Sequence, residues 1–155
     1  MRGPRFCILC LLLVTGTFAS RTGAFAEDPS KGIVPFGSKL PVAAIAGLYE
    51  GPEIKEGGSH HMYLRVLADG TIMDLSTGDS RENVAKRMVK GTTDKYVGVG
   101  TVKLDSGRVT FTTANQDATI QYQGEVSGDT LILNWKSTYK DHVAKGEVFR
   151  LLRGL

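Results

Sequence analysis

Three histidines are the residues of this chain with the most evident potential for chemistry. His60 and His61 are adjacent, and His142 follows far along the chain. Adjacent residues of a strand point to opposite faces of the sheet, so His60 and His61 cannot readily share one ion. The sequence has no His-x-x-x-His spacing, and its two cysteines are Cys7 and Cys10. We therefore predict no metal site and no cofactor, and we interpret His60-His61 as the start of a strand near solvent.

The sequence also lacks a recognisable catalytic motif. It contains no Gly-x-Ser-x-Gly elbow, which would place a nucleophilic serine on a sharp turn. Gly98-x-Gly100 lies within a predicted strand and not at a strand-to-helix turn, so it does not predict phosphate binding. Asp141-His142 is a weak hint of acid–base chemistry in a loop. We predict that the protein is not an enzyme.

Five residues favour ligand binding instead: Tyr122, Trp135, Ser137, Glu147 and Phe149. A two-residue turn at Gly128-Asp129 would place Tyr122 opposite Trp135. An odd-length loop around His142 would place Phe149 opposite Trp135 and point Ser137 and Glu147 to the same side. An apolar wall with a few polar groups suits a small apolar or amphiphilic ligand. The same side chains could equally fill a core, so both interpretations stay open.

Alternating apolar and polar residues predict the elements that would position these side chains. We expect eight strands, at 43–50, 60–67, 71–77, 96–104, 108–114, 118–126, 130–138 and 146–152. A helix is predicted at 80–90, with Asp79 as its N-cap, Glu82 completing a capping box and Gly91 ending it. The apolar stripe of this helix consists of Val84, Ala85, Met88 and Val89.

Three turn signals set the predicted strand pairing. Asp69-Gly70, taken as a two-residue turn, pairs Leu64 with Leu75 inside and Arg65 with Asp74 as an ion pair in solvent. Ser106-Gly107 and Gly128-Asp129 likewise separate an apolar face from a polar one. A meander with one apolar face must close into a barrel or stack as a sandwich. We predict an all-β fold, an eight-stranded up-and-down antiparallel barrel with one short helix between strands three and four.

Three short segments resemble lipocalin-like domains of the calycin type. They are Gly47-Leu48-Tyr49, the segment 63–70 (YLRVLADG), and Tyr122-x-Gly124-x-Val126-x-Gly128-Asp129-x-Leu131. The first stands where such barrels carry Gly-x-Trp, with tyrosine in place of tryptophan. The resemblance implies a barrel domain over residues 42–155. It carries over no catalytic residue.

The N-terminus predicts export. Arg2 and Arg5 precede an uncharged apolar run at 6–14, and Ala24-Phe25-Ala26 forms a small-x-small cleavage site. We predict a signal peptide at 1–26, with cleavage after Ala19 as the alternative, and an extended lead-in at 27–41. Removal of residues 1–26 discards both cysteines and lowers the 19 basic residues to 16, equal to the 16 acidic ones. A neutral mature chain predicts no nucleic-acid partner. The apolar run at 6–14 is too short to span a bilayer, so we predict no membrane span in the mature chain, and the oligomeric state stays open.

Three functions are compatible with these features. The first is a periplasmic or secreted barrel that binds a small hydrophobic or amphiphilic molecule in its interior. The second is a non-enzymatic interaction or inhibitor module of the cell envelope with a filled core. The third is a barrel enzyme such as an isomerase, with Glu147 beside a cavity as its titratable group.

Overall fold

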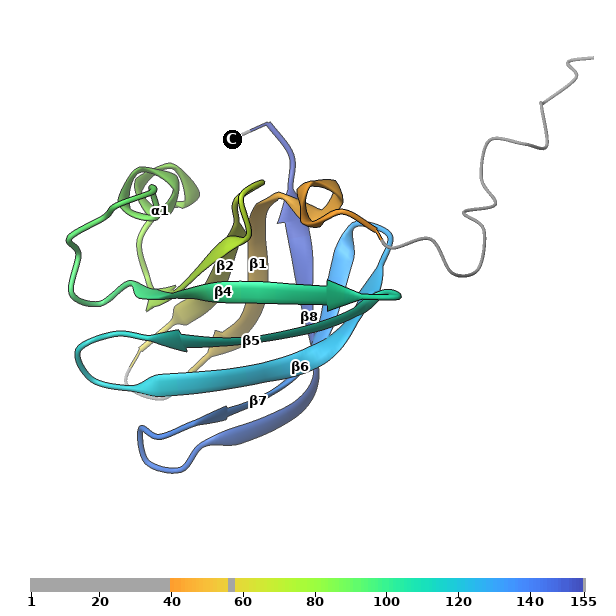
Figure 1. Cartoon of the computed structure of the whole chain (residues 1–155). Coiled ribbons are helices and arrows are strands. Elements are labelled where there is room, and N and C mark those ends of the chain that lie inside the picture. The colour runs from red at the N-terminus through yellow and green to blue at the C-terminus, as the bar shows by residue number, and fades with distance from the viewer. Residues whose placement is uncertain (1–39, 56–57, 155) are drawn as a thin grey trace, which may run out of the picture. The chain divides into compact units, whose positions relative to one another are not determined.

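The computed structural model describes residues 40–55 and 58–154, which form a closed barrel of eight antiparallel strands (Figure 1). Each strand pairs with its neighbours in sequence, and the last pairs with the first. The predicted eight-stranded meander with a helix after its third strand is therefore confirmed. The predicted signal peptide, its cleavage site and the lead-in up to residue 39 lie outside the described residues. The strands are β1 Gly47–Ile54, β2 His60–Val66, β3 Thr71–Thr77, β4 Gly98–Asp105, β5 Arg108–Ala114, β6 Thr119–Ser127, β7 Thr130–Ser137 and β8 Val143–Leu152.

One end of the barrel, which we call the closed end, holds a short 3-10 helix. This helix, η1 Val42–Ile45, occupies residues where the sequence predicted the start of the first strand, so that boundary was wrong. Figure 1 shows it in orange, beside β1. Ile45 is buried in the core, and the Tyr49 hydroxyl donates a hydrogen bond of 2.9 Å to its carbonyl oxygen. The apolar Val-Ala-Ala-Ile segment is thus used to cover the barrel rather than to extend its sheet.

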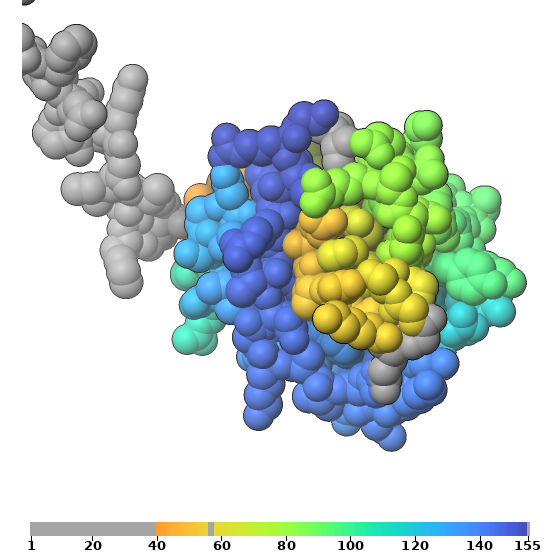
Figure 2. Space-filling view, turned by 180° about the vertical axis from the view of Figure 1, so that it is seen from behind, coloured from red at the N-terminus to blue at the C-terminus, as the bar shows by residue number. Residues whose placement is uncertain are grey.

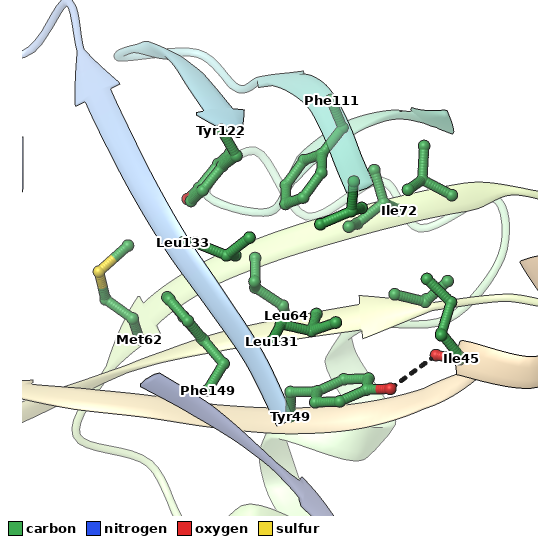
Figure 3. Packing of buried hydrophobic residues seen from close by; sticks show 13 residues of the cluster. Ile45, Tyr49, Met62, Leu64, Ile72, Phe111, Tyr122, Leu131, Leu133 and Phe149 are labelled. Carbon is green, nitrogen blue, oxygen red and sulfur yellow. Dashed lines mark hydrogen bonds between the residues drawn. The ribbon is translucent and has the colours of Figure 1, made fainter. Parts of the chain in front are cut away.

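Apolar side chains from the strands fill the barrel near this closed end (Figure 3). Leu64, Leu131, Leu133 and Phe149 have no solvent exposure. Phe111 stacks on Tyr122, with ring centroids 4.4 Å apart. Burial of each such side chain stabilises the fold by about 1.5–3 kcal/mol. This part of the interior is therefore a packed core.

A second apolar cluster lies outside the barrel, under helix α1 Arg81–Arg87. Val84 and Met88 pack there against Tyr63, Met73 and Leu75 of the sheet. Figure 2 shows the helix region, in light green, against the orange and yellow residues of β1 and β2. The outer face of these strands is consequently apolar as well, so the alternation of apolar residues does not show which residues of β2 and β3 point inward.

The helix is shorter than the predicted 80–90, and its cap differs. Its N-cap is Ser80, whose Oγ accepts a hydrogen bond from the Asn83 amide, and not Asp79. The helix ends at Arg87, so Val89 is 45% exposed instead of completing the buried stripe. Asp79 accepts a hydrogen bond from Arg87 instead of capping the helix.

The β2–β3 register differs from the prediction by one residue. The Leu67 amide donates to the Thr71 carbonyl, so the connection has three residues and not two. Gly70 adopts φ +89°, a left-handed conformation that glycine favours. Leu64 therefore pairs with Asp74, and Arg65 pairs with Met73. The predicted Arg65–Asp74 ion pair is wrong: Asp74 points into the barrel, while Arg65 lies on the outer face.

Arg65 takes part in holding the helix. Its Nη1 donates to the carbonyl oxygens of Ala85 and Met88, at 2.7 Å and 3.0 Å. These carbonyls belong to the C-terminal end of α1, where unpaired acceptors and the helix dipole favour a cation. Arg65 therefore caps the helix from the sheet beneath it.

The β4–β5 and β6–β7 hairpins have the predicted register. Val102 pairs with Phe111 across the Ser106-Gly107 turn, and Tyr122 pairs with Trp135 across Gly128-Asp129. In each case the apolar residues face inward. The two-residue turn is thus a reliable guide where only one face of the hairpin is covered.

The last hairpin was predicted incorrectly. The Ser137 amide donates a hydrogen bond to the His142 carbonyl oxygen, so the loop between them has an even number of residues. Lys140 and Asp141 in this loop adopt positive φ. A bulge then shifts the register between Leu133 and Trp135. Phe149 consequently lies opposite Leu131 and not opposite Trp135, and Glu147 lies opposite Leu133. Lys-Asp is an unusual pair for such a turn, which is why the sequence did not indicate it.

A pocket at the mouth of the barrel

The end of the barrel opposite η1, which we call the mouth, contains a pocket of about 930 Å³. Its wall combines apolar side chains from five strands with polar groups from strands and loops. Four of the apolar residues, Ile54, Met62, Ile120 and Trp135, also pack against the core. A volume of several hundred Å³ with an apolar wall and a few polar groups is typical of small-molecule sites. The filled closed end and the open mouth divide the barrel interior into two parts.

Trp135 and Ser137, two of the predicted binding residues, line this pocket. Trp135 is partly buried, and its indole Nε1 has no hydrogen-bond partner in the part of the chain that the structure describes. Ser137 is buried, and its Oγ accepts a hydrogen bond of 3.0 Å from the Tyr139 amide. The register set by Gly128-Asp129 places both side chains on the inner face of β7.

The other three predicted residues do not line the mouth pocket. Tyr122 and Phe149 are buried deeper in the filled core. Glu147 faces the same side as Leu133 and is partly exposed. The structure thus brings Trp135 and Ser137 together in the pocket wall, with Tyr122 paired to Trp135 on the neighbouring strand, and it leaves Glu147 and Phe149 outside the pocket.

The histidines are distributed as strand alternation requires. His60 lines the mouth pocket, whereas His61 lies on the outer face near the Tyr63 ring, 6.3 Å between centroids. The Nδ1 atoms of both are buried without a hydrogen-bond partner among the described residues. His142 lines the pocket from the β7–β8 loop. Within residues 40–55 and 58–154, no three histidine or acidic side chains gather as a metal site would require.

Charges at the rim of the pocket are largely paired. The Arg87 guanidinium contacts Asp94 at 2.7 Å and also Asp79. The hydrogen bond to Asp94 is the main cause that raises the pKa of Arg87, and the same bond lowers the pKa of Asp94. Lys140 lies over the exposed Tyr139 ring at 5.2 Å, and Asp117 completes the rim. The pocket is therefore not a strongly charged site.

A buried polar cluster near the pocket was not foreseen from the sequence. Asp74, two residues along β3 from Ser76 in the pocket wall, is only 4% exposed. Its Oδ2 accepts hydrogen bonds from the Tyr122 hydroxyl at 2.9 Å and from the Thr113 hydroxyl at 3.0 Å. Burial raises the pKa of Asp74, although these hydrogen bonds act in the opposite direction. Burial also raises the pKa of Tyr122 well above its usual value.

Gly98 makes room for this carboxylate. Its amide also donates to Asp74, and a Cβ at this position would lie 1.9 Å from Oδ1. The acid is thus held by β4, β5 and β6 at once and shielded from solvent. Such an arrangement links strands across the interior and leaves the carboxylate inaccessible to a molecule in the pocket.

Comparison of the chain with protein-family models, with curated proteins and with solved structures gave no match. The class is therefore defined by architecture: a closed eight-stranded antiparallel β-barrel, compatible with a lipocalin-like fold, with one short outer helix. Among the described residues, neither helix is long and apolar enough to cross a membrane.

Proposed function

We propose that this protein is an exported, non-enzymatic barrel that binds a small apolar or amphiphilic molecule in its mouth pocket. The observation that carries the proposal is a pocket of about 930 Å³ whose wall combines apolar side chains, Trp135 among them, with a few polar residues such as His60 and Ser137. Apolar surface provides affinity, and a small number of polar groups within it provide orientation. Export rests on the N-terminal charge, apolar run and small-x-small order.

The buried Asp74 supports binding rather than catalysis. A general acid or base must come within hydrogen-bond reach of its substrate. Asp74 instead accepts hydrogen bonds from the Tyr122 and Thr113 hydroxyls and from the Gly98 amide, and it is almost completely buried. Its raised pKa is accounted for by burial in a structural cluster.

Fluorescence of Trp135 tests the proposal, because it is the only tryptophan and lines the pocket. Titration with a library of fatty acids, retinoids and small phenols should yield compounds that change its emission saturably and raise the melting temperature. Ile120 points into the pocket, and the adjacent Gln121 points outward. Ile120→Trp should therefore abolish the ligand-induced rise in melting temperature, whereas the matched Gln121→Trp should retain it.

An interaction module is the second candidate. Val143 is 59% exposed on the outer surface, and Val148 of the same strand is also exposed. Exposed apolar side chains favour contact with another protein where they form one contiguous patch. A library that leaves both emission and melting temperature unchanged would favour this function over the first.

A further inference from the structure

The wall of the barrel is incomplete between β3 and β4 on the side of the mouth. The two strands pair only over residues 71–74 of β3 and 98–101 of β4, although β3 continues to Thr77. The chain that leads into β4 follows the β5–β6 loop instead, where the Lys95 carbonyl oxygen accepts a hydrogen bond of 3.2 Å from the Gln116 amide. Within the described residues, the last part of β3 is therefore a short sheet edge with no strand paired to it on this side.

Ser76 presents its backbone N–H and C=O to this edge. The Leu67 amide donates to the Thr71 carbonyl oxygen on the β2 side, and the Val102 amide donates to the Gly70 carbonyl oxygen on the β4 side. Both ladders of β3 run without a register shift, so the backbone groups of every second residue from Gly70 to Ser76 face the β4 side. Ser76 is exposed and lines the mouth pocket. Its backbone donor and acceptor thus lie beside the pocket, outside any ladder.

A residue paired with Ser76 would place its own side chain in the mouth pocket. Paired residues of antiparallel strands carry their side chains on the same face of the sheet. Ser76 lies two residues after Asp74, whose carboxylate points into the barrel, so its side chain also faces inward. On its other side Ser76 is paired with Met62, which is buried and lines the pocket. The incoming side chain would therefore enter the pocket on the side of Met62.

The charged and titratable residues of the pocket favour a neutral side chain at this position. The Arg87 guanidinium is already bonded to two carboxylates, and the rim carries one charge of each sign, Lys140 and Asp117. Two histidines also line the pocket. The Nδ1 atom of His60 is buried, so an atom in the pocket cannot reach it, and His142 lies on the β7–β8 loop. Apolar surface at Met62 is thus what the side chain meets first.

We propose that a short, extended peptide binds at this edge, with its backbone paired to Ser76 and one neutral, apolar side chain in the mouth pocket. The inference rests on the proposed binding function of the same pocket and adds the class of ligand. Addition of a strand to a free sheet edge gives affinity through main-chain hydrogen bonds and specificity through side-chain pockets. Because Ser76 offers one donor and one acceptor, the side chain must supply most of the specificity. Water is the competing partner for both backbone groups.

Four matched peptides test the inference on the full mature chain. The parent is acetyl-Thr-Leu-Thr-N-methylamide, with its leucine as the residue that pairs with Ser76. A methyl group on the leucine nitrogen removes the donor to the Ser76 carbonyl oxygen, and it should weaken binding about three- to tenfold. A methyl group on the nitrogen of the second threonine replaces an N–H that points away from β3, and it should leave the affinity nearly unchanged. The analogue with glutamate in place of leucine should bind more weakly than the parent.

Amide hydrogen exchange measured by NMR locates the contact on the protein. The Ser76 N–H should exchange rapidly in the free protein and slowly with the parent peptide, whereas the Leu75 N–H, which faces β2, should exchange slowly in both. Ser76→Pro removes this N–H, at a position where the N–H faces away from the neighbouring strand and proline is tolerated. It should bind the parent about three- to tenfold more weakly. Ser76→Ala, the matched control, should keep the affinity.

Equal binding of the two methylated peptides, or Ser76 exchange that the bound parent does not slow, would overturn the inference. The peptide would then bind through its side chain alone, and the binding function would stand. Tighter binding of the glutamate analogue would also overturn it, because cationic groups such as the histidines or Lys140 would then set the preference. If fatty acids, retinoids or phenols bind and the peptides do not, the inference fails and the function stands. If neither group binds saturably, the proposed function itself fails.

Discussion

Removal of the Tyr122 hydroxyl should destabilise the protein by an amount that depends on pH. Tyr122 is 3% exposed and Asp74 is 4% exposed, so water cannot replace the lost hydrogen bond of 2.9 Å. A hydrogen bond between neutral groups contributes about 0.5–1.5 kcal/mol, and one to a charged group about 1.5–3 kcal/mol. Tyr122→Phe should therefore cost about 1 kcal/mol where Asp74 is protonated and about 2–3 kcal/mol where it is ionised.

The direction of the pH dependence follows from the raised pKa of Asp74. The ordinary pKa of the carboxyl is about 3.8, and burial raises it in the folded state. Between these two values the folded protein binds more protons than the unfolded chain, so this group makes stability fall as pH rises. The hydrogen bond from the Tyr122 hydroxyl lowers the pKa of Asp74 and so acts against the effect of burial. Without this bond the pKa of Asp74 in the folded protein rises further, and stability continues to decrease up to a higher pH. The loss of stability of Tyr122→Phe relative to the wild type therefore grows with pH.

Urea denaturation followed by circular dichroism at pH 3.5 and pH 8 measures this deficit. Tyr139→Phe is the matched control, because Tyr139 is 52% exposed and should change stability little. In an Asp74→Asn background, the deficit caused by Tyr122→Phe should no longer depend on pH. A deficit that is the same at both pH values, or smaller at pH 8, would refute the coupling between the two residues.

Three further substitutions test the packing around this cluster and under the helix. Gly98→Ala places a Cβ 1.9 Å from Asp74 Oδ1 and should cost about 1–3 kcal/mol in unfolding experiments, but less when Asp74 is also replaced by Ala. Arg65→Ala removes two hydrogen bonds to α1 carbonyls and should cost about 1–2 kcal/mol, with faster amide exchange in α1 as its specific signature. Leu64→Ala should cost about 2–5 kcal/mol, but it should not accelerate amide exchange selectively in α1. Equal amide exchange in α1 of Arg65→Ala and Leu64→Ala would contradict the capping role of Arg65.

The sequence predicted the barrel because its polar and apolar faces alternate clearly over β4 to β7. It failed at β2–β3 for a physical reason. Helix α1 covers the outer face of these strands, so Tyr63, Met73 and Leu75 are apolar outside while Leu64 and Ile72 are apolar inside. Alternation then cannot select the register, and a one-residue difference in turn length moves Asp74 from solvent to the core.

The candidate site was predicted only in part for a similar reason. Trp135 and Ser137 were placed correctly on the inner face, because the Gly128-Asp129 turn fixes their register. Whether Phe149 lies opposite Trp135 depends on the register of the last hairpin. That hairpin contains a bulge and two residues at positive φ. The sequence carries no clear signal for that bulge. Which part of the interior is filled and which is open depends on packing in three dimensions.

Native mass spectrometry of the protein isolated from its source tests the central claim, that the mouth pocket holds a small molecule, most directly. The wild-type chain should carry an additional non-covalent mass that collisional activation releases. Ile120→Trp, which fills the pocket, should lack this mass, and Gln121→Trp, which adds the same side chain outside, should retain it. A wild-type spectrum with only the mass of the polypeptide, or a mass that Ile120→Trp retains, would contradict the account.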